Sequence, residues 1–114
     1  MLEIHQSTVG KVIILDIKGR IDAINSHILQ SAIDRASGDA HERPLLLGMA
    51  DVNYLSASGL RVLRILKEQS GTVRIFEPSN RVIDVMHITG LDAVYELYLT
   101  RTEALQQATD DDTL

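Results

Sequence analysis

The sequence contains no cysteine, so the fold has neither disulfides nor a thiol nucleophile. It also lacks an apolar stretch of bilayer length, since the segment from Pro44 to Ala50 is only as long as a strand. The amino-terminal residues MLEIHQS contain no basic segment followed by a long apolar run, so we expect no secretion signal. These absences favour a cytoplasmic protein with no membrane insertion.

A basic surface is missing as well. The formal net charge is −5, and part of it comes from Asp110, Asp111 and Asp112. Because nothing attracts phosphate backbones, we expect no nucleic-acid partner. The 114 residues suffice for one domain with its own hydrophobic core. We assign residues 1–108 to this domain and residues 109–114 to an acidic, flexible tail.

Motifs for catalysis, metal binding and cofactor binding are absent. The segment Asp51-Val52-Asn53 starts like a calcium loop, but Leu55 occupies the next ligand position. Ser58 has no glycine two residues before it, as a nucleophile elbow would require, and no Walker or dinucleotide motif occurs. Histidines do not recur at the spacing of a helical metal site; they stand at His5, His27, His41 and His87. We therefore expect no catalytic residue, metal or cofactor, although a triad built from distant residues stays open.

Segments of strand and helix character alternate along the chain. Alternating strands and helices predict a mainly parallel sheet with right-handed crossovers, here preceded by an antiparallel hairpin. The fold class is thus α/β, a single domain with a mixed, mostly parallel sheet and about four helices. We expect strands at 2–7, 11–19, 45–49, 72–76 and 94–98, and helices at 26–36, 57–69, 80–89 and from a cap at Thr102 to residue 108.

The segment from Asp51 to Gln69 is the most informative part of the chain. Its apolar residues fall on one face of a helix, at Leu60, Val62, Leu63, Ile65 and Leu66. Ser56 is placed to cap that helix. Ser58 stands beside Gly59, whose missing Cβ leaves room for a partner backbone, so we expect Ser58 to be exposed. An ordinary first-turn serine and a modified one both fit this pattern.

Three motifs carry a resemblance to a known family. The segment MADVNYLSASGLRVLRIL resembles the core motif of the STAS family, the bacterial anti-sigma factor antagonists, in which a strand ending near an aspartate leads to Asp-Ser-(Ser or Thr)-Gly-Leu. The GRID turn, from Gly19 to Asp22, is similar to the family's Gly-Glu-Leu-Asp. The segment SNRVIDVMHITGLDAVYELY is similar to its third helix and Thr/Ser-Gly-Leu ending. The order and spacing of these motifs, over nearly the whole chain, identify it as a member.

The resemblance implies a phosphorylation switch. In the family a partner kinase phosphorylates the serine after the motif aspartate, and the unmodified protein binds the anti-sigma kinase and frees the sigma factor. Here Ala57 stands at the acceptor position and Ser56 replaces the aspartate. The acceptor is then Ser58, our first choice, or Ser56, our second, because capping engages its oxygen. Otherwise the switch is absent.

Our leading hypothesis is an anti-sigma factor antagonist with an anti-sigma factor serine kinase and a PP2C-type phosphatase as partners. One rival is a STAS adaptor without a phosphoswitch, associated with a transporter or a stressosome-like scaffold, which Ala57 favours. A small enzyme acting on a nucleotide or sugar phosphate is the other. We expect a monomer or weak homodimer. The predicted partner-binding residues are Gly19, Arg20, Asp22, Asp51, Asn53, Ser56, Ala57, Ser58, Gly59 and Arg61.

Overall fold

The computed structural model describes residues 1–37, 43–69 and 72–112. Its five strands form one sheet in the order β1-β2-β3-β4-β5. Strands β1 and β2 pair antiparallel, whereas the pairs β2/β3, β3/β4 and β4/β5 are parallel. These observations confirm the predicted fold class. The elements are β1 Leu2–Val9, β2 Val12–Ile21, α1 Ser26–Ser37, β3 Leu45–Leu55, α2 Ala57–Gln69, β4 Val73–Phe76, α3 Asn80–Thr89, the short 3₁₀ helix η1 Leu91–Ala93, β5 Leu97–Tyr98 and α4 Arg101–Asp112.

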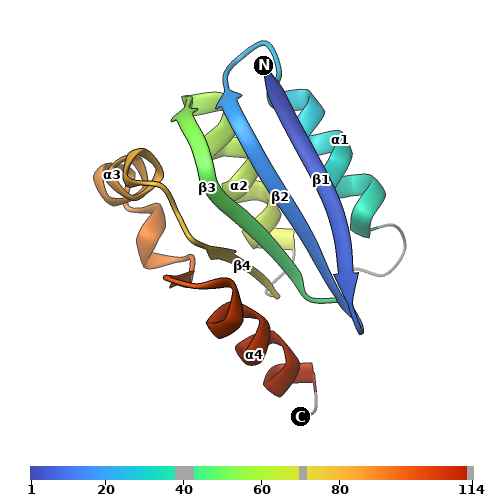
Figure 1. The fold of residues 1–114 in the computed structure, drawn as a ribbon. Coiled ribbons are helices and arrows are strands. Elements are labelled where there is room, and N and C mark those ends of the chain that lie inside the picture. Colours follow the sequence, from blue (N-terminus) through green and yellow to red (C-terminus); the bar gives the residue numbers. More distant parts are fainter. Residues whose placement is uncertain (38–42, 70–71, 113–114) are drawn as a thin grey trace.

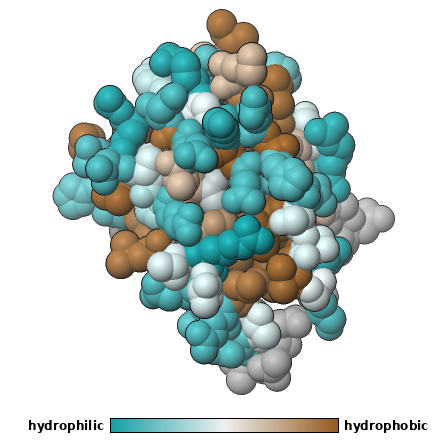
Figure 2. Space-filling model, viewed as in Figure 1, coloured by the Kyte–Doolittle hydropathy of each residue, from teal (hydrophilic) through white to brown (hydrophobic). Residues whose placement is uncertain are grey.

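Helices cover the two faces of the sheet unequally. Helices α1 and α2 lie behind the sheet in Figure 1, and α4 lies at the lower end of the opposite face. The larger apolar cluster, behind the sheet, includes Leu47, Leu63 and Ile75. The smaller one, beneath α4, includes Ile14, Phe76, Ala104 and Ala108. The rest of the α4 face carries mostly hydrophilic side chains at its surface (Figure 2).

Apolar residues of α1, β3, α2 and β4 are buried in the core: Ile33, Leu45, Leu46, Leu47, Leu60, Leu63, Leu66 and Val73. Helix α2 turns its apolar stripe inward, as its spacing predicts. Helix α3 begins after Ser79, whose hydroxyl accepts the N–H of Val82, and ends at Gly90 with a φ of 75°. Both ends therefore follow ordinary capping chemistry.

Strand β3 is longer than predicted, because residues 51–55 are strand and not loop. The carboxyl-terminal part of β2, from Lys18 to Ile21, pairs with Asp51 to Leu55, with one shift of register before Lys18 and another between Gly19 and Arg20. The alternation signal is broken there by polar residues, so the pattern alone ends the strand at Met49. The ladder supplied by β2 extends it to Leu55.

The carboxyl-terminal elements also differ from prediction. Residues 94–96 are not strand, since Tyr95 is buried and its hydroxyl donates to the carbonyl oxygen of Leu63 at 2.6 Å. The cap of α4 is Thr100 and not Thr102: Thr100 Oγ1 accepts the N–H of Glu103 and donates to its carboxylate, both at 3.1 Å. Thr100 is therefore the N-cap of α4, and its hydroxyl also bonds to the carboxylate of Glu103. Helix α4 continues through Asp112 into the predicted tail, whose last two residues lie outside the described part.

Candidate partner-binding surface at the ends of β2 and β3

The two polar segments that the sequence singles out, the GRID turn and the start of α2, are adjacent in space. Arg20 and Ile21 at the end of β2 pair with Tyr54 and Leu55 at the end of β3. The N–H of Ser56 then donates to the carbonyl oxygen of Ile21 at 2.9 Å. Pairing between the strands therefore continues to the residue that caps α2. Both segments lie outside the carboxyl ends of parallel strands, where sites in α/β folds commonly form.

The first turn of α2 presents its residues with different exposure. Ser56 is the predicted N-cap: its Oγ accepts the N–H of Gly59 at 3.2 Å, and its carbonyl oxygen accepts the N–H of Leu60 at 2.9 Å. Ala57 is exposed, as is Arg61 one turn later. Ser58 is half-buried, and so it is less exposed than predicted. Of residues 56–60, only Ala57 is exposed.

Gly59 serves packing within the chain and does not make room for a partner backbone. It is buried, and a Cβ atom at this position would lie 2.7 Å from Cγ2 of Ile21 and 2.8 Å from Cδ1 of Leu55. Real Cβ atoms do not approach that closely. The glycine therefore allows α2 to sit directly against the ends of β2 and β3.

Polar side chains fix the shape of the GRID turn. Oδ1 of Asp22 accepts the N–H groups of Ile24 and Asn25, both at 3.0 Å. In return, Oδ1 of Asn25 accepts the N–H of Asp22 at 2.9 Å, and its amide donates to the carbonyl oxygen of Arg20 at 2.8 Å. Gly19 adopts a φ of 109°, and a Cβ there would lie 2.0 Å from the carbonyl oxygen of Met1. Gly19 and Asp22 thus hold the backbone in place.

Tyr54 and Ile24 also belong to this surface, although the sequence analysis did not predict them. The guanidinium of Arg20 lies over the ring of Tyr54, with 4.3 Å between its Cζ atom and the ring centroid. Ile24 follows in the turn and is 84% exposed. Tyr and Arg are enriched among the residues that carry most of the binding energy of protein interfaces. If the sequence had shown that β3 extends to Leu55, the pairing of Arg20 with Tyr54 on neighbouring strands would have identified Tyr54.

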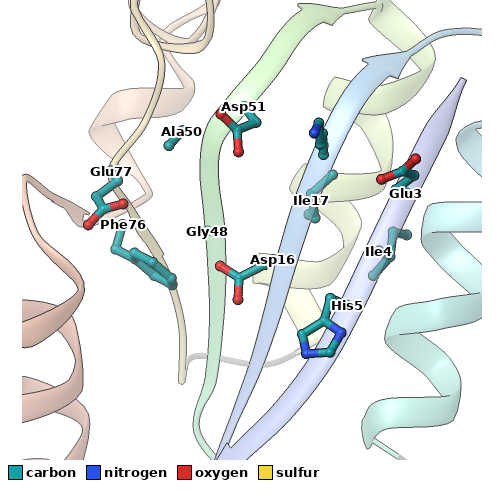
Figure 3. A pocket seen from close by; sticks show the side chains of 11 residues that line it. Glu3, Ile4, His5, Asp16, Ile17, Gly48, Ala50, Asp51, Phe76 and Glu77 are labelled. Atoms are coloured by element: carbon teal, nitrogen blue, oxygen red, sulfur yellow. The ribbon is translucent and has the colours of Figure 1, made fainter.

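Asp51 and Asn53 line other parts of the surface. Asp51 borders a hollow of about 430 Å³ on the uncovered face of the sheet, with Asp16, Glu3 and His5 on the neighbouring strands (Figure 3). Gly48 also lines this hollow, and a Cβ there would lie 2.5 Å from Oδ1 of Asp16 and 2.6 Å from Cζ of Phe76. Asn53 borders a second hollow beside Ser79, Arg81 and Asp84 at the start of α3. The structure thus distributes the predicted partner-binding residues over neighbouring regions.

The side chain with the most strongly shifted pKa, Tyr95, lies away from the predicted partner-binding residues. Burial raises the pKa of the Tyr95 phenol well above its ordinary value. Burial also lowers the pKa of the Lys67 ammonium, which lies 5.5 Å from the centroid of the Tyr95 ring. Both residues belong to the junction of α2 with the segment after η1. We therefore expect the shifted pKa values of Tyr95 and Lys67 to affect the stability of the fold.

Two features are absent from the part of the chain that the structure describes, a metal site and a membrane span. There, no three His, Asp or Glu side chains are grouped so that they could hold a metal ion. Of the histidines, His41 lies outside the described residues. Over the same residues, no helix is both long and apolar enough to cross a membrane.

Several solved structures share this architecture. An anti-sigma factor antagonist from Mycobacterium paratuberculosis is 25% identical, with a TM-score of 0.87 over 96% of this chain and 95% of that one. A putative anti-sigma factor antagonist from Thermotoga maritima is 19% identical, with a TM-score of 0.84 over 93% and 94% of the two chains. The phosphorylated form of the Bacillus cell fate determinant SpoIIAA is 13% identical, with a TM-score of 0.69 over 92% and 98%.

The family model of the STAS domain matches residues 3–104. The chain therefore belongs to the STAS domain family. No curated protein matches the sequence.

Proposed function

We propose that this STAS domain is an anti-sigma factor antagonist that binds an anti-sigma factor serine kinase through the surface at the ends of β2 and β3. The observation that carries the proposal is the 2.9 Å hydrogen bond between Ser56 N–H and the carbonyl oxygen of Ile21, which joins the GRID turn to α2. The likeness to the Mycobacterium antagonist, 25% identical over 96% of this chain, supports the same class of partner. The role is binding, not catalysis, in the cytoplasm.

Phosphorylation at the start of α2 controls the complex, and a PP2C-type phosphatase reverses it. Ser58 is the first-choice acceptor. It occupies the first turn of α2, where the helix dipole and free N–H groups favour negative charge. A phosphate there adds a charge of about −1.5 to −2, which the domain tolerates while an acidic partner surface is repelled. The phosphorylated form of SpoIIAA supports a switch of this kind in the fold.

Ser56 is the second-choice acceptor. Its Oγ accepts the N–H of Gly59 at 3.2 Å, so modification there would compete with the cap of α2. Losing such a cap costs about 1 kcal/mol. Phosphorylation of Ser56 would therefore loosen the first turn of the helix, while phosphorylation of Ser58 would leave the cap intact.

One observation favours a second candidate, an adaptor without a phosphoswitch. The exposed residue of this first turn is Ala57, which has no oxygen to modify, and the serine that follows is half-buried. Such a subunit would dock constitutively on a transporter or a stressosome-like scaffold. It would use the same surface without a kinase.

A pull-down from the native cell, followed by mass spectrometry, separates the two candidates. Recovery of an anti-sigma factor kinase supports the antagonist, and recovery of transporter or scaffold subunits alone supports the adaptor. Incubation with the recovered kinase and ATP should then add one phosphate, which maps to Ser58. Absence of both a kinase and a phosphate in cells would refute the phosphoswitch.

A further inference from the structure

The two edges of the sheet differ in their protection. Strand β5 is only two residues long, so it exposes little backbone. Strand β1 has eight residues, LEIHQSTV, and pairs with β2 from Leu2 to Val9 without a shift of register. It contains no proline, no lysine and no bulge, which are the usual devices that prevent an edge from pairing with another chain. The β1 edge is therefore open to a further strand.

The pairing of β1 with β2 identifies the unused backbone groups. The N–H of Arg20 donates to the carbonyl oxygen of Met1 at 3.2 Å, so Met1 and Arg20 form a hydrogen-bonded pair. Bonded and non-bonded pairs alternate along an antiparallel ladder. Odd-numbered residues of β1 therefore bond to β2. The even-numbered ones, Leu2, Ile4, Gln6 and Thr8, direct their N–H and C=O groups toward the free edge.

The side chains beside this edge are partly uncovered. Leu2 and Ile4 pack under α1 but are only half-buried. Together with Ile28, which is 43% exposed, they border a hollow of about 210 Å³ between β1 and α1. Helix α1 thus does not seal the edge. Glu3 and His5 lie on the opposite face, among the residues drawn in Figure 3, and both are exposed.

We propose that a second copy of this chain pairs with the edge through its own β1, antiparallel and around a two-fold axis. Ile4 then lies opposite Ile4 of the second copy, and Leu2 lies opposite Gln6. The same register places each Glu3 opposite His5 of the other copy. Backbone hydrogen bonds supply the attraction, as in other strand additions, and the two-fold axis closes the assembly at two copies.

Charge complementarity selects this register over its neighbours. Moving the second strand by two residues in one direction places Glu3 opposite Glu3, and in the other direction it places His5 opposite His5. Like charges directly opposite each other destabilise the first of these registers, and the second places each Glu3 opposite Ser7 and so separates it from the imidazole. Only the proposed register joins a carboxylate to an imidazole at both symmetric positions. It also brings the two Ile4 side chains together over the hollow beside α1.

Charge reversal tests the proposal in the full chain. In sedimentation velocity the wild-type protein should show a monomer–dimer equilibrium that depends on concentration. Glu3→Lys and His5→Glu should each raise the dissociation constant about tenfold, because each removes or reverses two symmetric pairs. The double variant restores opposite charges and should return the constant to within about threefold of wild type. Glu68→Lys, an exposed residue on α2, is the matched control and should change nothing.

Removal of one N–H tests the role of the edge itself. Gln6→Pro deletes a donor that faces the free edge, so it should abolish dimerisation, and Gln6→Ala keeps the donor and should not. Circular dichroism verifies that both variants fold. A wild-type protein that stays monomeric up to millimolar concentration would overturn the proposal, as would equal dimerisation of the two Gln6 variants.

Hydrogen exchange of the wild-type chain reports the register without any substitution. On concentration, the N–H groups of Ile4 and Gln6 should become protected, because they bond to the second copy. The N–H of Thr8 should stay unprotected, since the proposed register ends at Gln6. Protection of Thr8 as well would indicate the register with His5 opposite His5 and would overturn the Glu3–His5 pairing.

Discussion

Gly59 and Ile21 touch so closely that a Cβ atom on the glycine would lie 2.7 Å from Cγ2 of the isoleucine. This contact seats the first turn of α2 on the end of β2 and so shapes the surface that we assign to the partner. Gly59→Ala should lower the free energy of unfolding by about 1 kcal/mol, because crowding outweighs the gain in helix propensity. Chemical denaturation measures this change, with Ser58→Ala as the control. A more stable Gly59→Ala variant would show that the turn has room.

The core face of α2 gives a larger effect. Leu63 is 0% exposed, so Leu63→Ala should cost about 2 to 5 kcal/mol of unfolding free energy. Leu99 is 79% exposed, and Leu99→Ala should change stability by less than about 0.5 kcal/mol. A loss below about 1 kcal/mol for Leu63→Ala would contradict the orientation of the helix.

The exposed side chains of Tyr54 and Ile24, next to the GRID turn, should contribute to partner binding and not to folding. Tyr54→Ala and Ile24→Ala should each weaken binding of the kinase by about tenfold, since a few large side chains carry most of the binding energy of an interface. Asp22→Lys is a poor probe, because Asp22 accepts two backbone N–H groups at 3.0 Å and its loss would reshape the turn. Isothermal titration with the recovered partner measures the affinity, and thermal unfolding of each variant confirms that it is folded. Unchanged affinity in both variants would place the interface elsewhere.

Phosphorylation should follow the hydroxyls of the first turn. Incubation with the kinase and ATP should add one phosphate to the wild-type chain and none to Ser58→Ala. Ser58→Asp should weaken binding, although a single charge imitates a phosphate incompletely. A switch from 99:1 to 1:99 requires a change of about 10⁴ in the equilibrium, roughly 5.5 kcal/mol. If only Ala57→Ser accepts phosphate, the acceptor has been lost and the adaptor explains the protein better.

Alkaline stability should depend on Tyr95. Its pKa is raised by burial, so the folded state holds the proton that the unfolded state releases near pH 10. The corresponding stability is complete below about pH 10 and is lost as the pH rises from there toward the folded-state pKa. Burial also raises the pKa of Tyr98. Because Tyr98 is the same in the wild type and in Tyr95→Phe, the difference between the two proteins reports Tyr95 alone.

The Tyr95→Phe variant lacks the hydrogen bond to Leu63, so it should be about 1 kcal/mol less stable at neutral pH. Its stability should fall less steeply above pH 10 than that of the wild type. Denaturant titrations at several pH values give both quantities. Equal alkaline slopes in the two proteins would contradict the assignment to Tyr95.

The sequence alone was sufficient to predict the helices whose spacing and caps depend only on neighbouring residues. Helix α2 follows from the spacing of Leu60, Leu63 and Leu66, and its cap from Ser56. The same is true of α3 between Ser79 and Gly90. Periodicity and capping depend on residues within one turn of each other, which a single sequence displays in full.

Contacts between distant segments were decided only by the tertiary structure. Strand β3 reaches Leu55 because β2 offers it a ladder, and residues around Tyr95 leave the sheet because its hydroxyl bonds to α2. The packing role of Gly59 depends on its contact with Ile21, which is 38 residues earlier in the printed sequence. The sequence predicts that the GRID turn and the start of α2 form one surface, because both are polar segments at the ends of strands. Which of their side chains face solvent depends on packing across β2 and β3, and no local pattern contains that information.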